Sequence, residues 1–152
     1  MVLRLVIFLI LNFAALAIGG LFTGKGVPSE WYTDLNKAPW TPPGWVFGFA
    51  WTSIMILFAI YMSELWAQID DKKWLVVLFS VQWVLNVLWN PLFFHYHNMA
   101  LSLLVIIALT LLVAFLFFYY WPELKFKSFL ILPYVVWMFI ATSLNLYISI
   151  HN

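Results

Sequence analysis

The stretch LSLLVIIALTLLVAFLFF, residues 101–118, decides the fold class of this chain. Ser102 and Thr110 are its only polar side chains, and it carries no charge. A helix needs roughly 20 predominantly apolar residues to cross a hydrocarbon core about 30 Å thick. The period-two alternation that is typical of membrane barrel strands is absent. The stretch therefore predicts a membrane-spanning helix.

Four further apolar runs of similar length lie before and after this stretch. Together with it they predict five spans, at about residues 2–23, 43–66, 73–94, 99–121 and 128–150. The connections are short except for residues 24–42, which join the first two spans. The sequence thus predicts an all-α fold, an integral membrane bundle of five transmembrane helices. We expect a single domain over residues 1–152, with a lid-like loop at 24–42.

Composition excludes several classes of function. The chain is 66% hydrophobic and 9% charged, whereas a typical soluble domain has about 25% charged residues. A net charge of +1 provides no basic surface for nucleic acid. Cysteine is absent, which excludes disulfides and thiolate ligands. His95 and His97 are two possible ligands where a zinc site needs three or four, so we expect no metal site and no bound cofactor.

The lysine and arginine residues predict the orientation in the membrane. Loops on the cytoplasmic side carry an excess of these residues. Position 4 and the second and fourth loops hold five of them, whereas residues 24–42 hold only Lys25 and Lys37. We therefore expect a cytoplasmic N-terminus, with the C-terminus and residues 24–42 outside. The five are Arg4, Lys72, Lys73, Lys125 and Lys127.

Small residues recur in the first span at a spacing of four. Ala15 and Gly19 form one pair, and Gly20 and Gly24 form another. This spacing lets helix backbones approach closely in lipid. We therefore interpret the first span as a packed helix rather than a cleavable signal peptide.

A polar stripe runs along the third span. Gln82, Asn86 and Asn90 recur every four residues and so share one helical face. Two interpretations remain open: hydrogen bonds between helices, or amides that line a ligand cavity. Pro91 cannot donate a backbone hydrogen bond, so we expect a kink or a loosened turn beside Asn90.

The fifth span carries a comparable pattern. Pro133, Trp137, Ala141 and Asn145 lie four apart, so one face offers a kink, a large ring, a small residue and an amide. Space beside a small residue would suit a ligand. Ordinary packing of Trp137 and a close helix contact at Ala141 are the alternative.

Three blocks of sequence resemble the signature of a known family. The first is WYTDLNKAPWTPPGWVFGFAWT, residues 31–52; the second lies between Gln82 and Phe94, and the third between Pro133 and Asn145. In this order, and spread over nearly the whole chain, the three blocks resemble those of the translocator protein family. The family is also called tryptophan-rich sensory proteins or peripheral benzodiazepine receptors.

The resemblance implies a five-helix bundle, often a homodimer, with a pocket beneath the first loop. In that family the pocket accepts porphyrins such as protoporphyrin IX and heme-type tetrapyrroles, and in eukaryotic members also cholesterol and benzodiazepine-type drugs. By motif position, the implied ligand-binding residues are Tyr32, Pro42, Trp45, Trp51, Asn86, Phe93, Trp137 and Ala141.

One departure from the family concerns sterols. Animal members carry an apolar residue, a tyrosine and then a basic residue near the C-terminus, a weak pattern for cholesterol. Here Leu146 and Tyr147 are followed by no lysine or arginine. We therefore expect a porphyrin-type member of a bacterial plasma membrane.

Three functions follow as hypotheses. The leading one is a membrane receptor that binds porphyrins and similar flat hydrophobic ligands, for sensing, sequestration or transport. The second is an enzyme that degrades porphyrin in light, in which Trp51 and Trp137 supply electrons or radicals. The third is a carrier of porphyrins or sterols, although no charge lies in mid-span and no inverted repeat is visible to support alternating access.

Overall fold

The computed structural model describes residues 2–152. Within them, five helices are long and apolar enough to cross a membrane, which confirms the predicted all-α bundle. These helices are α1 (Val2–Gly26), α3 (Gly44–Gln68), α4 (Lys72–Phe94), α5 (Met99–Tyr119) and α7 (Leu132–His151). Short elements complete the chain: α2 (Glu30–Asp34) in the first loop, and α6 (Trp121–Leu124) with the 3-10 helix η1 (Lys125–Leu130) before α7.

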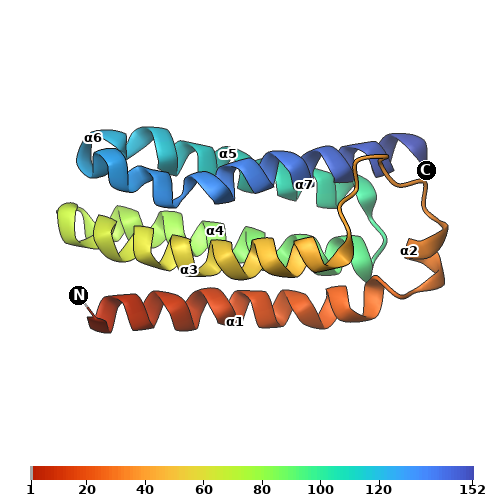
Figure 1. Ribbon diagram of the computed structural model, residues 1–152, viewed down its shortest axis with the longest axis horizontal. Helices are drawn as coiled ribbons and strands as arrows, with labels where there is room; N and C mark the ends of the chain where they lie inside the picture. The colour runs from red at the N-terminus through yellow and green to blue at the C-terminus, as the bar shows by residue number, and fades with distance from the viewer. Residues whose placement is uncertain (1) are drawn as a thin grey trace.

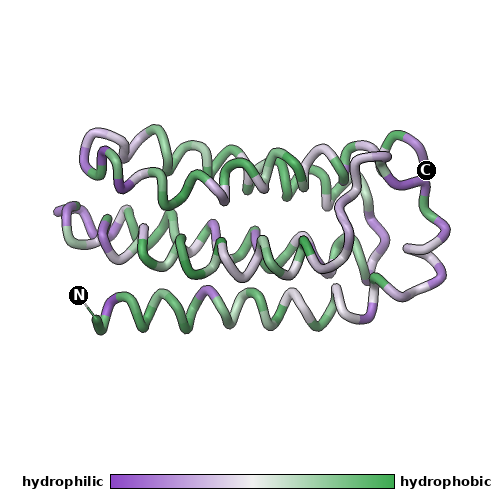
Figure 2. The backbone as a smooth tube through the Cα atoms, viewed as in Figure 1, coloured by the Kyte–Doolittle hydropathy of each residue, from purple (hydrophilic) through white to green (hydrophobic). Residues whose placement is uncertain are grey.

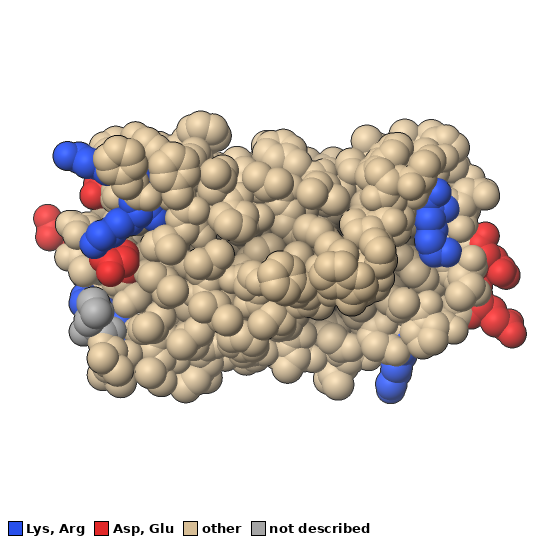
Figure 3. Space-filling view, viewed as in Figure 1, with Lys and Arg blue, Asp and Glu red and all other residues tan. Residues whose placement is uncertain are grey.

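The long helices lie side by side, with the two termini at opposite ends (Figure 1). α1 packs against α3 and α4, while α5 packs against α4 and α7. Hydrophobic residues dominate the length of the helices, and hydrophilic residues concentrate towards the ends and loops (Figure 2). The visible charged side chains gather at the two ends, with an uncharged surface between them (Figure 3). This distribution is that of a membrane-embedded bundle.

Capping residues set several helix ends. The Asp71 carboxylate accepts from the backbone N–H of Trp74 at 3.1 Å, and the Asn98 amide oxygen accepts from that of Leu101 at 3.0 Å. Each bond satisfies an N–H that has no partner within its helix. Pro91 lies in the last turn of α4, which ends three residues later at Phe94.

The start of the fifth span differs from its prediction. The chain forms α6 and η1 up to Leu130, and α7 begins at Leu132 rather than near residue 128. Lys125, the first residue of η1, has a φ of 48°, in the left-handed region. This backbone turn prevents α6 and η1 from forming one continuous helix. The kink expected at Pro133 is also wrong, because Pro133 lies in the first turn of α7, where the missing N–H costs no helical hydrogen bond.

Close packing and a few hydrogen bonds hold the bundle together. Lipid tails are as apolar as the side chains, so burial adds little driving force between helices in a bilayer. Phe58 is fully buried at the centre. The buried Asn12 amide donates to the Met55 carbonyl at 3.0 Å, and the Tyr61 hydroxyl donates to the Leu116 carbonyl at 2.8 Å. These bonds tie α1 to α3 and α3 to α5.

The small residues of α1 divide into two kinds. Ala15 and Gly19 are buried, and a Cβ on Gly19 would lie 2.7 Å from the amide nitrogen of Asn90. The predicted close contact is therefore present at this pair. At Gly20 and Gly24 an added Cβ would meet no atom within 4 Å, so within residues 2–152 no other helix packs closely on that pair.

Candidate ligand-binding site

A cavity of about 590 Å³ lies beneath the first loop, between α1, α3 and α4. Its volume falls within the range of about 300–1,000 Å³ that is typical of small-molecule sites. α1 contributes the small residues Ala15, Gly19 and Gly20, whereas Trp51 of α3 and Trp89 of α4 contribute large rings. The α1 wall therefore exposes backbone at its two glycines, beside the side chains of Leu16 and Thr23, and the large rings come from the facing helices.

Four of the residues expected from the sequence line this cavity. Tyr32 and Pro42 come from the first loop, Trp51 from α3 and Asn86 from α4. They are 54 residues apart along the chain at most, and the loop brings the first two over the helices that carry the others. The structure therefore collects half of the expected set around one space.

The other four lie outside the lining. Trp45 is 72% exposed and lies with Phe49 among the exposed hydrophobic residues of α3. Phe93 is buried, with its ring centroid 6.3 Å from that of Tyr32. Trp137 is buried edge-on against Phe47 at 5.3 Å, and Ala141 is half-buried on α7. Phe93 and Trp137 therefore pack behind the lining residues Tyr32 and Phe47, whereas Trp45 faces outwards.

Several lining residues were not expected from the sequence. Phe47 lies one helical turn before Trp51, and Trp89 lies three residues after Asn86, so the helical period could have indicated both. The contribution of α1 had no such signal, because its small residues predicted helix contact alone. The unexpected lining residues include Gly19, Gly20, Thr23, Phe47, Trp89 and Phe94.

The polar stripe of α4 serves two purposes. Gln82 is buried and its amide donates to the Tyr134 hydroxyl at 2.8 Å, a tie to α7. The Asn90 amide oxygen accepts from the Thr23 hydroxyl at 2.8 Å, a tie to α1. Asn86 lines the cavity, and within residues 2–152 its side chain has no hydrogen-bond partner. Of the two amides that line the cavity, those of Asn86 and Asn90, that of Asn86 is therefore the one available to bind a ligand.

Tyr32 and Lys37 bring polar groups to the loop side of the cavity. Burial raises the pKa of the Tyr32 phenol above its ordinary value of 10.0, so the hydroxyl stays protonated at neutral pH and can donate. The Lys37 ammonium lies 4.7 Å from the centroid of the Tyr32 ring and donates to the Thr33 carbonyl at 3.1 Å. Lys37 is the cationic residue of the lining.

The first loop is fastened over the cavity at three points. The Trp31 ring stacks on the His97 ring of the α4–α5 connection, with centroids 3.9 Å apart. The Trp40 indole N–H donates to the Ser143 hydroxyl of α7 at 3.1 Å. Asn36 and Asn152 exchange hydrogen bonds: the Asn36 backbone N–H donates at 2.9 Å, and its carbonyl accepts at 3.3 Å. The loop is thus a cover held by contacts that can break separately.

Breaking one fastening is expected to loosen this cover. Asn152→Ala removes both bonds to Asn36, each with a net value of about 1 kcal/mol, so we expect residues 24–42 to open at least about fivefold more often. Limited proteolysis and hydrogen exchange of the loop measure this change. Thr33→Ala is the control, because its hydroxyl bonds only locally, to Glu30. Equal loop protection in the two variants would contradict the fastening role of Asn152.

Comparison with known proteins identifies the family. The model of the TspO/MBR family matches residues 7–151, which include most of α1, the other four long helices and the loop that covers the cavity. The chain belongs to the TspO/MBR family. It is an integral membrane protein of that family, and the resemblance drawn from the three sequence blocks is confirmed.

Relatives in the TspO/MBR family come from bacteria, archaea and animals. The tryptophan-rich sensory protein of Cereibacter sphaeroides is 36% identical over 118 residues, which cover 78% of this chain and 74% of that protein. The tryptophan-rich protein TspO of Archaeoglobus fulgidus is 37% identical over 144 residues, 91% of this chain and 92% of that one. The human translocator protein is 27% identical, over 84% of this chain and 78% of its own length.

Proposed function

We propose that this protein is a membrane receptor for porphyrins and similar flat hydrophobic molecules, which bind in the cavity beneath the first loop. The observation that carries the proposal is the combination of walls in that cavity. A backbone surface at Gly19 and Gly20 stands with the rings of Trp51 and Trp89 around a space of about 590 Å³. A flat ring system gains most from such walls, because aromatic faces stack on it.

The polar groups of the cavity fit the edges of a porphyrin. Its propionates are anions, and Lys37 supplies a cation on the loop side. An amide such as that of Asn86 can donate a hydrogen bond to a propionate oxygen. In the orientation expected from the lysine and arginine residues, the cavity would open on the outer side of a bacterial plasma membrane.

The placement of Trp137 favours a receptor over a Trp-dependent enzyme. That enzyme hypothesis pairs Trp51 with Trp137 at the ligand. Trp137 instead packs on Phe47, whereas Phe47 itself lines the cavity. The pair would not share a bound ligand, so binding is the function we propose.

Removing the Trp51 ring tests the site. Trp51→Ala is expected to weaken protoporphyrin IX binding about tenfold or more, because it removes both stacking and buried area. The measurement is a titration in detergent that follows quenching of the remaining tryptophan fluorescence. Trp45→Ala is the matched control, since that ring is 72% exposed on the same helix. Equal affinities in the two variants would place the porphyrin elsewhere.

The free amide gives a second, smaller test. Asn86→Leu keeps the approximate size of the side chain and removes its hydrogen-bonding groups. We expect affinity to fall about threefold to tenfold, which corresponds to one net hydrogen bond. Unchanged affinity would show that Asn86 does not contact the ligand, while leaving the Trp51 result to decide the site.

A further inference from the structure

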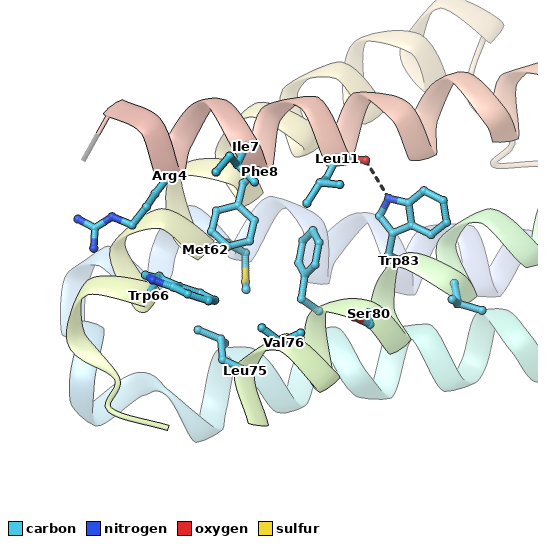
Figure 4. A pocket seen from close by; sticks show the side chains of 12 residues that line it. Arg4, Ile7, Phe8, Leu11, Met62, Trp66, Leu75, Val76, Ser80 and Trp83 are labelled. Carbon is cyan, nitrogen blue, oxygen red and sulfur yellow. Dashed lines mark hydrogen bonds between the residues drawn. The ribbon is translucent and has the colours of Figure 1, made fainter. Parts of the chain in front are cut away.

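A second cavity lies towards the other end of the bundle. It is an apolar groove of about 590 Å³ with walls from α1, α3 and α4, here called the N-terminal groove. Figure 4 shows Arg4 and Trp66 at one end of it, and Leu11 and Trp83 at the other. It shares no lining residue with the cavity beneath the first loop.

The N-terminal groove has the length and direction of a lipid chain in one leaflet. Arg4 and Leu11 are seven residues apart on α1, which at 1.5 Å per residue is about 10 Å. Leu75 and Val84, nine residues apart, mark about 13 Å of α4 by the same rise. One leaflet of a 30 Å hydrocarbon core is about 15 Å thick. The groove therefore follows the helices through most of one leaflet.

The charge of the groove lies at the end that contains Arg4 and Trp66, near the membrane surface (Figure 4). Arg4 is the charged residue of the lining, and no acidic side chain lies with it there. Within residues 2–152 its guanidinium has no carboxylate partner, since the ion pair present joins Lys127 to Glu64. Lys72 adds a second cation, with its ammonium 5.5 Å from the centroid of the Trp66 ring. The lining itself therefore carries a single positive charge, that of Arg4, while Lys72 donates to the Trp66 and Ile69 carbonyls and follows the acidic pair Asp70 and Asp71.

We propose that the N-terminal groove binds one acyl chain of an anionic glycerophospholipid, whose phosphate is held by Arg4. A guanidinium matches the geometry of phosphate oxygens and can bind two of them at once. Anionic lipids are enriched in the cytoplasmic leaflet, and basic pockets between helices on that side suit their headgroups. A second copy of the chain is the weaker fit, because a two-fold axis along the membrane normal would set a second Arg4 at the same depth.

Lipid retention in native mass spectrometry tests the charge. The purified protein is mixed with equal amounts of dioleoylphosphatidylglycerol and dioleoylphosphatidylcholine. We expect wild type to retain phosphatidylglycerol in preference, and Arg4→Gln to reduce that preference about fivefold. Lys73→Gln is the control, because it removes a cation from the same end without touching the groove lining. Equal preferences in Arg4→Gln and wild type would overturn the proposal.

Filling the groove tests the position of the acyl chain. Val76 lines it and is 47% exposed, whereas Val77 is 48% exposed and lies outside the lining. Val76→Phe is expected to lower retention of both lipids at least about threefold, and Val77→Phe to leave it unchanged. Both variants should keep the helical circular dichroism and the elution volume of wild type, which shows that they fold.

Other occupants give different results. Displacement of the phospholipid by equimolar oleate would indicate a fatty-acid site instead. Conversion of a dimer to a monomer by Val76→Phe, with lipid retention unchanged, would indicate an interface between copies. Either result overturns the phospholipid proposal. Neither depends on the porphyrin site, which Trp51→Ala tests separately.

Discussion

Gly20→Leu is expected to abolish protoporphyrin IX binding while the protein remains folded. Gly20 lines the cavity beneath the first loop, and an added Cβ meets no atom within 4 Å. A leucine there occupies space that the ligand needs, and its Cβ lies in open space. It also replaces a glycine within a helix, which favours the helix by up to about 1 kcal/mol. A loss of affinity of a hundredfold or more is the expected result of the fluorescence titration.

Gly24→Leu is the matched control for this prediction. Gly24 lies one turn further along α1, and its Cβ position is also open, but it does not line the cavity. It should gain the same helix preference and keep wild-type affinity. If both leucine variants bound porphyrin like wild type, the cavity beneath the first loop would not be the binding site.

Phe58→Ala is expected to produce the largest loss of stability. The Phe58 ring is fully buried, and its centroid lies 5.3 Å from that of Tyr134 and 6.0 Å from that of Phe79. Its removal leaves a cavity where α3, α4 and α7 meet, and such truncations cost about 3–5 kcal/mol. We expect the free energy of unfolding to fall by about 3 kcal/mol, at the lower end of this range. In lipid the transfer of the ring out of water contributes less, whereas its lost packing contacts contribute in full.

Unfolding in mixed micelles of mild detergent and dodecyl sulfate measures this free energy. Phe49→Ala is the control, because Phe49 is 68% exposed on the same helix. Its free energy of unfolding should change by no more than about 0.5 kcal/mol. Similar losses in the two variants would show that the centre of the bundle is not closely packed.

The spans and the loop were predictable because their signals are local. A run such as residues 101–118 has no alternative to a membrane helix, and this needs no knowledge of its neighbours. The start of α7 was less predictable, since the left-handed φ of Lys125 depends on how α6 and η1 meet α3. The kink assigned to Pro133 failed for the same reason: the effect of a proline depends on whether its helix has already begun.

The candidate site was predictable only in part. Helical spacing shows which residues share one face of a helix, but not which helix or cavity that face contacts. Gln82, Asn86 and Asn90 share one face, and only the positions of Tyr134 and Thr23 show which amides are already bonded. Likewise Trp45 and Trp51 belong to one motif, yet one is exposed and the other lines the cavity. These differences arise from the neighbouring helices, which a single sequence does not place.

The backbone that α1 exposes at its two glycines has a consequence for the range of molecules that the cavity can hold. Rings such as Trp51 and Trp89 can rotate about their side-chain bonds, but a surface of Gly19 and Gly20 has no rotamers to change. At the two glycines, adjustment to a thicker or thinner ligand must therefore come from the side chains that face them. The surface at Gly19 and Gly20 would therefore favour flat ligands over puckered or branched molecules of the same volume.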